Sequence, residues 1–395
     1  MRSGRVGAGL LVAPLFLFLL LSFLAPIAVF LWRGVTDTEV ATTLPRTIAA
    51  LRDWDGTALP SDAAFAALVE DLRAARARDR EAGTGEIARA AARLNTDRPG
   101  MRGVLPATAR RVDRALGLPP REAVLEAAPD WEEVESWGAI RRAAGPLTAF
   151  HLLAALDFRR DAAGGLHESD QPIFRRVILR SLWIGALCTL IALLLGWPLA
   201  WLIATTTPRV ATLLLGAVLL PFWTSLVVRT AAWMVLLQRE GVVNSALLQS
   251  GLVQAALPLL FNRTAVLLSM THILLPFMVL PLAASFAALD KRLLRAAASL
   301  GAPPWRRFLR VTLPLSLPGI GAGCVLVFIQ ALGFYVTPAL LGGPDDQMLA
   351  WFIGFYANRT VNWGIAAALS LILLAAVALC ATLYARLRSG VVLKA

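Results

Sequence analysis

Long apolar segments constrain this chain more than any other feature. Each segment has about 20 residues or more, enough to cross the roughly 30 Å hydrocarbon core of a bilayer as a helix. Because a backbone in lipid must satisfy its own hydrogen bonds, they predict an all-α membrane protein. Its six expected transmembrane helices cover Leu10–Trp32, Leu182–Thr205, Ala211–Leu237, Ala265–Leu289, Ile320–Leu341 and Trp363–Tyr384.

The uneven distribution of charge orients these spans. Residues 33–172 hold 19 Arg and 22 Asp plus Glu, so this segment contributes −3, and the remainder +15, to the net charge of +12. Short loops rich in Arg and Lys stay on the cytoplasmic side, which places loop 290–313 and both chain termini inside. The basicity is therefore explained by membrane orientation. No basic tract interleaved with stacking aromatics indicates a nucleic-acid surface.

Three regions follow from this pattern. Residues 1–32 predict a cytoplasmic tip and the first helix. A cleaved signal peptide is the alternative, but its apolar region is normally about 7–15 residues, shorter than this run, so we predict an anchor. Residues 173–395 hold the other five helices, and Ile173–Arg180 is a candidate for an amphipathic helix lying along the outer surface.

Residues 33–172 form a polar insertion between the first two membrane helices, on the outer side. Turn residues separate amphipathic stretches in it, and β-branched alternation is absent, so we expect a mostly helical domain. Its core can be loose or tight, given the composition rich in Ala and Arg. The expected helices are Asp62–Arg80, with Ser61 as its N-cap, Glu86–Leu94, Ala107–Leu116 and Glu132–Ala144.

The basic loop 290–313 is the most informative motif. Lys291–Leu300 is rich in good helix formers, and Gly301 supplies a left-handed stop. A second short helix, Pro303–Arg310, begins at a proline pair and has two faces. Its apolar ridge consists of Trp305, Phe308 and Leu309, and its other face of Arg306, Arg307 and Arg310. Pro314 and Pro318 are expected to reset the chain as it re-enters the membrane. A stiff loop with an exposed aromatic ridge predicts docking of another protein.

This loop resembles the cytoplasmic coupling loop of ABC-importer permeases. The family pattern is Glu-Ala-Ala, three residues, Gly, nine residues, Ile, one residue, Leu-Pro. Here Arg295 replaces the Glu, and the matching positions are Ala296, Ala297, Gly301, Val311, Leu313 and Pro314. The resemblance implies the type-I importer permease fold, with the loop seated in a groove of an ATP-binding subunit. The residues implied to couple to that subunit are Ala296, Ala297, Gly301, Pro303, Trp305, Arg306, Phe308, Arg310 and Pro314.

A second block, in the third span, is similar to the spermidine/putrescine-type branch of these permeases. The elements that follow in the branch's order are Pro221-Phe-Trp, Arg229-Thr-Ala-Ala-Trp233 and Gly241-Val-Val-Asn244, and Gly333–Gly343 fits the same branch. This resemblance covers about 173–390 and implies half of a path for a small organic solute, polyamine-like, opine or related. The residues expected along that path are Arg229, Trp233, Gln330, Tyr335 and Asp345.

Two questions about this path stay open. Arg229 is costly to bury, so it faces a water-filled path or a partner such as Glu240, or else it snorkels to the outer surface. Few carboxylates could neutralise a polycation near the outer face: Glu240, Asp345 and Asp346. That shortage leaves the solute undecided between a polyamine and the branch's other cargoes.

The chain shows no chemistry of an ATPase or another enzyme. Neither of its lysines, Lys291 and Lys394, follows a glycine, so there is no Walker A loop. The histidines have no metal-ligand spacing, and His272 is expected to be a packing or hydrogen-bonding residue. We therefore expect no catalytic residue, no cofactor and no metal site. Cys188, Cys324 and Cys380 lie in apolar segments and are expected to be packing residues.

The energy for transport would then come from partners. The resemblance implies two ATP-binding subunits, a second permease subunit and a periplasmic solute-binding protein, assembled in a bacterial inner membrane. Two alternatives belong to other classes. An ion-driven secondary carrier would have inverted repeats and acidic residues at the midplane, which we do not find. A membrane sensor or scaffold would use the insertion as a receptor and would have a sizeable cytoplasmic output domain.

Overall fold

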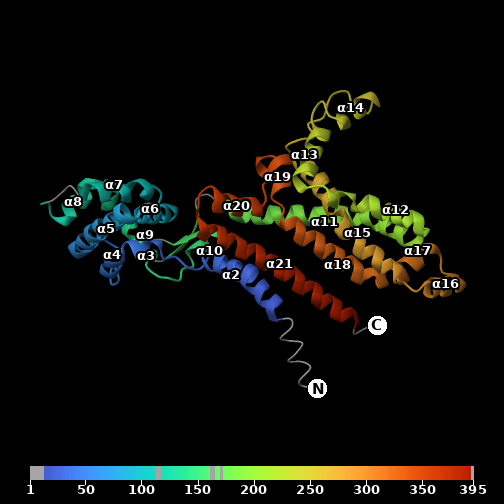
Figure 1. Cartoon of the computed structure of the whole chain (residues 1–395), viewed down its shortest axis with the longest axis horizontal. Helices are drawn as coiled ribbons and strands as arrows, with labels where there is room; N and C mark the ends of the chain where they lie inside the picture. The colour runs from blue at the N-terminus through green and yellow to red at the C-terminus, as the bar shows by residue number, and fades with distance from the viewer. Residues whose placement is uncertain (1–12, 113–116, 161–164, 170–171, 393–395) are drawn as a thin grey trace, which may run out of the picture. The chain divides into compact units, whose positions relative to one another are not determined.

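The computed structural model describes residues 13–112, 117–160, 165–169 and 172–392 (Figure 1). Helices dominate this part of the chain, and it forms two compact units. The first unit comprises residues 1–175 and 356–371, and the second comprises residues 176–355 and 372–395. Five helices are long and apolar enough to cross a membrane, and a sixth span results if a helix pair bent by 101° counts as one. The predicted all-α membrane fold is confirmed, with five continuous spans and one bent helix pair in the place of the sixth.

The first unit contains the first span, whose described part is Ala13–Trp32, and the insertion; residues 10–12 of the predicted span lie outside the described residues. Its helices begin and end at the expected kinds of residue: α5 starts after Ser61 and stops at Gly83, which has a φ of +62°. The Ser61 side chain, however, makes no capping hydrogen bond. The elements are η1 Leu20–Leu24, α2 Ala25–Trp32, α3 Glu39–Thr43, α4 Pro45–Ala50, α5 Asp62–Ala82, α6 Glu86–Asp97, α7 Met101–Val112, α8 Pro120–Ala127, η2 Pro129–Glu132, α9 Val134–Arg142, α10 Phe150–Ala155, β1 Phe158–Arg160 and β2 Leu166–Glu168.

Two helices of the insertion differ from their predicted bounds. The helix predicted over Ala107–Leu116 starts earlier, at Met101, and contains Pro106, while residues 113–116 lie outside the described residues. The earlier start follows from packing, because the N-terminal half of α7 presents a buried face made of Met101, Val104 and Leu105. The helix predicted over Glu132–Ala144 is divided into η2 and α9.

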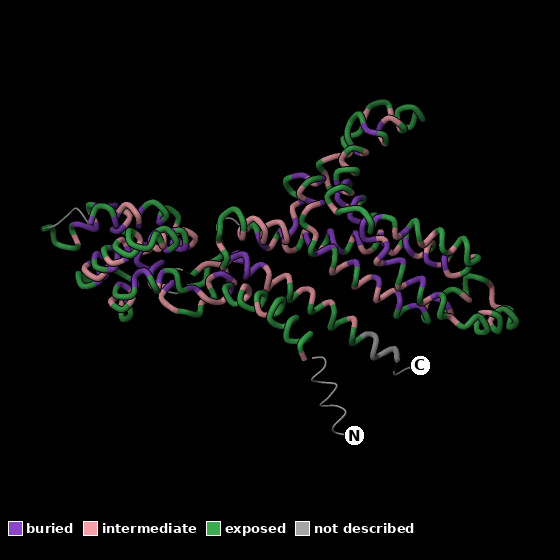
Figure 2. Tube along the Cα trace, viewed as in Figure 1, coloured by how far each residue is buried: buried purple, intermediate pink, exposed green. Residues whose placement is uncertain are grey.

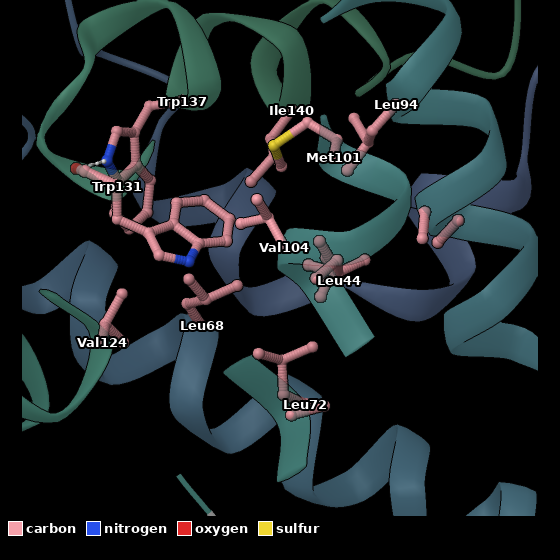
Figure 3. Packing of buried hydrophobic residues seen from close by; sticks show 14 of the residues in the cluster. Leu44, Leu68, Leu72, Leu94, Met101, Val104, Val124, Trp131, Trp137 and Ile140 are labelled. Carbon is pink, nitrogen blue, oxygen red and sulfur yellow. Dashed lines mark hydrogen bonds between the residues drawn. The ribbon is translucent and has the colours of Figure 1, made fainter. Parts of the chain in front are cut away.

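The insertion has a tight core of its own (Figure 3). Trp131 and Trp137 are completely buried at its centre, and the ring of Trp137 lies 4.6 Å from that of Phe65. Each indole has a hydrogen-bond acceptor: Trp131 donates to Thr108 Oγ1 at 2.8 Å, and Trp137 donates to the Trp131 carbonyl at 3.0 Å. Burying large aromatic rings while pairing their N–H groups stabilises one specific packing. Of the two possibilities, a loose or a tight domain, the structure therefore has the tight one.

Asp157 joins the insertion to the second span. It is 3% exposed, has a φ of +62°, and its carboxylate accepts backbone N–H groups from Ile173, Phe174 and Arg175 at 3.1, 3.0 and 2.8 Å. These N–H groups open α11, Phe174–Thr205, so a buried anion satisfies donors that a helix start leaves free. Residues 173–180 are therefore the start of one long helix, and the separate surface helix expected there does not form.

The second unit is a bundle around α15, Arg263–Ala287. Its partner α18, Leu313–Leu332, approaches closely through small residues, because a Cβ on Gly319 would overlap the side chain of Ser285. The remaining elements are α12 Pro208–Leu219, η3 Leu220–Trp223, α13 Leu226–Leu237, α14 Val242–Gln249, α16 Lys291–Ser299, α17 Pro304–Arg307, η4 Phe308–Thr312, α19 Val336–Leu341, η5 Pro344–Asp346, α20 Leu349–Asn358 and α21 Trp363–Val392, of which α20 and α21 extend into the first unit.

Two membrane spans differ from the straight segments expected. The third is broken at residues 224–225, where Pro208–Trp223 and Leu226–Gln249 meet at 101°. The fifth begins earlier and ends at Leu332, because Pro304–Leu332 is one helical run and α19 is separate. Pro314 and Pro318 do not interrupt this run. Pro314 occupies the first turn of α18, and Pro318 is accommodated inside it.

Candidate functional site

The loop 290–313, called the elbow from here on, is built by local capping interactions. The Asp290 carboxylate accepts the N–H of Arg292 at 2.8 Å and so caps the start of α16. At the other end Gly301 has a φ of +75°. The N–H of Ala302 donates to the carbonyl of Ala297 at 3.1 Å, and the N–H of Gly301 to that of Ala298 at 2.9 Å. This is the Schellman pattern, which ends a helix and turns the chain sharply.

The second arm of the elbow starts at the pair Pro303 and Pro304, and the backbone of Pro303 is extended. The N–H groups of Arg306 and Arg307 donate to the Pro303 carbonyl at 3.0 and 3.1 Å. The arm then passes through the π-helical turn η4 directly into α18. The predicted separate helix over Pro303–Arg310 is therefore the first part of the fifth span, Pro304–Leu332.

The elbow is exposed, and none of the residues of α16 and α17 is buried (Figure 2). Leu300 is 88% exposed, Trp305 59% and Leu309 49%. Phe308 differs from the other ridge residues because its ring lies 5.5 Å from that of Trp197 on α11. Only part of the predicted ridge is thus free for a partner, while Phe308 attaches the elbow to the bundle.

A surface pocket of about 270 Å³ lies in the bend of the elbow. It brings together four of the residues predicted to couple, Ala297, Gly301, Arg306 and Arg310, and is completed by Leu300, Ala302, Arg307 and Val311. The Arg307 Nε is buried and has no hydrogen-bond partner among the described residues. The elbow's arginines and Lys291 likewise form no ion pair within the described part of the chain. The pocket is therefore a cationic hollow with an apolar rim.

A second group of residues lies where α13 meets α15. The Trp233 Nε1 donates to His272 Nδ1 at 3.3 Å, and the two rings are 5.7 Å apart. Arg229, one turn earlier on α13, has a buried Nε that is unpaired within the described residues. An imidazole, an indole and a guanidinium therefore share one face, which is partly exposed on this chain. Arg229 forms no ion pair with Glu240 in the described residues, so that candidate partnership is not found.

The other residues expected along the path are not in this group. Tyr335 is 47% exposed and follows the end of α18, where its ring lies 3.4 Å from the site of a Gly354 Cβ. Gln330 is exposed on α18. The Asp345 side chain is 96% exposed and pairs with Arg180 at 3.6 Å. Its neighbour Asp346 is buried and pairs with Arg263 at 2.9 Å.

The hydrogen-bonding role predicted for His272 is confirmed, but its pairing with Trp233 was not predicted. This histidine was expected to be a packing or hydrogen-bonding residue; it does accept a hydrogen bond, but it is exposed although the residues beside it are buried. The sequence held one signal for this exposure, because His272 does not lie on the helix face that the buried apolar residues of α15 form. Without the bend in the third span, however, nothing in the sequence pairs it with Trp233. Among the described residues no group of three His, Cys, Asp or Glu could hold a metal ion.

Residues 181–392 match a family model described as "Binding-protein-dependent transport system inner membrane component". The spermidine/putrescine transport system permease protein PotB of Haemophilus influenzae is 38% identical over 215 residues, which cover 54% of this chain and 75% of the relative. The molybdenum transport system permease protein ModB of Mycobacterium bovis is 34% identical over 211 residues, covering 53% and 77%. The elbow and the Arg229 group lie inside the family match, and the insertion lies outside it.

One solved structure is also similar over the same share of the chain. It is a bacterial ABC transporter involved in the import of the acidic polysaccharide alginate, with 21% sequence identity and a TM-score of 0.44. The similarity covers 54% of this chain and 79% of that chain.

Proposed function

This chain belongs to the family of binding-protein-dependent transport system inner membrane components, and we propose that it forms half of the translocation path of an ATP-driven importer. A second permease subunit completes the path, and a periplasmic binding protein delivers the solute. Two ATP-binding subunits supply the energy, since this sequence has no Walker A loop. The observation that carries the proposal is an exposed, arginine-rich elbow inside the family match.

The elbow has the properties of a surface that another protein covers. A tryptophan side chain buries on the order of 200 Å² when fully enclosed. Covering the exposed 59% of Trp305 would therefore contribute about 3 kcal/mol, at about 25 cal/mol per Å². The unpaired arginines around the pocket would find carboxylates on the ATP-binding subunit, with Arg307 Nε as the donor that most needs an acceptor.

Motion of the elbow can reach the outer half of the bundle along one helix. The run Pro304–Leu332 has 29 residues, so it is about 43 Å long at 1.5 Å per residue. At its outer end α19 is tied to α13 by a 3.1 Å hydrogen bond between Thr337 and Thr230. In this proposal, closure of the ATP-binding subunits displaces the elbow, and α18 and α19 pass the displacement to the Arg229, Trp233 and His272 group. The broken third span would move at residues 224–225.

The proposed cargo is a small organic solute, polyamine-like, opine or related. The relatives' names mention spermidine, putrescine and molybdenum, so the family alone does not choose. The carboxylates of the outer loop, Asp345 and Asp346, already pair with arginines. Direct binding of labelled spermidine, a labelled opine and labelled molybdate, each to the purified binding protein, would identify the class.

The protein is a multi-pass inner-membrane protein. We further propose that both termini and the elbow face the cytoplasm, as the arginines of loop 290–313 favour. Labelling of single engineered cysteines in intact cells tests this orientation. A residue in the elbow should be protected from a thiol reagent that cannot cross membranes, and Arg102→Cys in the insertion should react.

Replacing Trp305 by Ala tests the coupling role. If the elbow docks the ATP-binding subunit, losing about 3 kcal/mol lowers co-purification of that subunit roughly a hundredfold and abolishes uptake. Leu252→Ala is the matched control, since Leu252 is a 74% exposed apolar residue outside the elbow. Equal recovery of the ATP-binding subunit with both variants would refute the docking role of Trp305.

A further inference from the structure

Residues at the end of the first span and in the insertion contact the first turn of the last span, α21, at three consecutive residues, 362–364. The Trp363 ring lies 6.1 Å from the ring of Phe30 and under the guanidinium of Arg33. Asn362, which caps α21 by accepting the N–H of Ile365 at 3.2 Å, donates to Thr96 at 3.4 Å. These contacts come from the end of the first span and from α6, and all belong to the first compact unit.

The third contact is the closest. The imidazole of His151, on α10, lies against Gly364 so tightly that a Cβ at residue 364 would overlap Nε2 and Cε1 of the ring. His151 is 4% exposed, and its Nδ1 is buried without a partner among the described residues. A glycine at this helical position is therefore required by the neighbouring histidine. We call the contacts of residues 362–364 with Phe30, Arg33, Thr96 and His151 the clamp.

The clamp contains a buried cation beside this histidine. Arg93, 6% exposed, pairs with Asp37, and its guanidinium lies 3.8 Å from the centre of the Phe150 ring, next to His151. Its Nη1 and Nη2 have no partner in the described part of the chain. The turn of α21 packed on the histidine, residues 363–371, has no titratable group. The buried carboxylates near Arg93 are already paired, Asp37 with Arg93 itself and Asp97, one turn further along α6, with Arg142.

We propose that the clamp is an acid-releasable link, in which protonation of His151 separates the insertion from the first turn of α21. A protonated ring would place a second cation in a closed contact whose carboxylates already pair with arginines, and moving into water relieves this cost. Release would free the outer end of the last span from the insertion. This inference does not depend on the proposed transport function, because it concerns only how the insertion, which lies outside the family match, packs on residues 362–364, which lie inside it.

The direction of the pH dependence follows from the contact. Burial first, and the charge of Arg93 second, lowers the pKa of His151 from 6.5 to about 3. A histidine held neutral stabilises the clamp above pH 6.5, and this stabilisation is lost as the pH falls from 6.5 towards 3. Between pH 8 and pH 5 the ratio of released to clamped molecules should rise about thirtyfold.

Hydrogen–deuterium exchange of the full chain in lipid nanodiscs tests this. The measured quantity is the protection factor of a peptide within residues 363–371, corrected for the intrinsic pH dependence of exchange. Protection in the natural protein should fall about thirtyfold from pH 8 to pH 5. In His151→Gln it should not change. His167→Gln is the control, because this exposed histidine lies outside the clamp, and it should behave as the natural protein does. A pH response that persists in His151→Gln, or none in the natural protein, overturns the proposal.

A second pair of variants tests the contact at constant pH. Gly364→Ala should lower protection of the same peptide at pH 8, since its Cβ displaces the imidazole. Adding His151→Ala should restore protection by making room. Gly103→Ala, at a helix position with nothing within 4 Å, should have no effect. If Gly364→Ala leaves protection unchanged, the clamp as described does not exist.

Discussion

Gly301 offers the sharpest test of the elbow, because its substitution isolates backbone conformation from packing. It has a φ of +75°, and a Cβ added there would meet nothing within 4 Å. A side chain therefore costs only the left-handed conformation, roughly 1–2 kcal/mol for an ordinary L-residue and least for Asn. Gly301→Val should shift the turn away from the Schellman geometry by a factor of about 5–30, whereas Gly301→Asn should keep it.

The assay is recovery of the co-expressed ATP-binding subunit with the permease, together with uptake, at equal amounts of permease in the membrane. Gly301→Ala should lie between Asn and Val in both measurements. All three side chains point into open space on this chain. Because Asn is larger than Ala, a clash would place Ala first, so the order Asn, Ala, Val reports the conformation of the turn. Equal recovery and uptake with Val and Asn would show that the geometry of this turn does not matter for docking.

Three further substitutions have expected outcomes. Asp157→Ala leaves three N–H groups at the start of α11 unpaired, one of them buried and two part-buried, and should cost about 3 kcal/mol, seen as a lower thermal unfolding midpoint, while Asp157→Asn retains most of the stability. Gly319→Val should force α15 and α18 apart and reduce the folded yield, whereas Gly216→Ala, which has open space, should not. Trp233→Phe removes the donor to His272 and should reduce uptake about two- to tenfold, while unchanged uptake would exclude that pair from the path.

The sequence alone predicted the parts that depend on local composition and backbone preference. Apolar runs longer than a bilayer is thick determine a membrane protein, because backbone groups in lipid need internal partners. Gly301 and the Pro303–Pro304 pair determined the elbow's turn, since left-handed φ and a missing N–H act within a few residues. The matching spacing from Ala296 to Pro314 identified the family before any contact was known.

Tertiary structure decided which side chains meet. The sequence grouped Trp305, Phe308 and Leu309 on one ridge, but Trp197 on another helix contacts the Phe308 ring and covers part of it, leaving it 38% exposed. His151 is one of three histidines without any spacing pattern, and only the packing of α10 against Gly364 makes it distinctive. Contacts between residues far apart in the chain depend on how helices cross, and the local sequence does not encode crossing directly. The bend of the third span and the tight core of the insertion were decided at that level, while the number of spans and the turn at Gly301 were determined by the sequence itself.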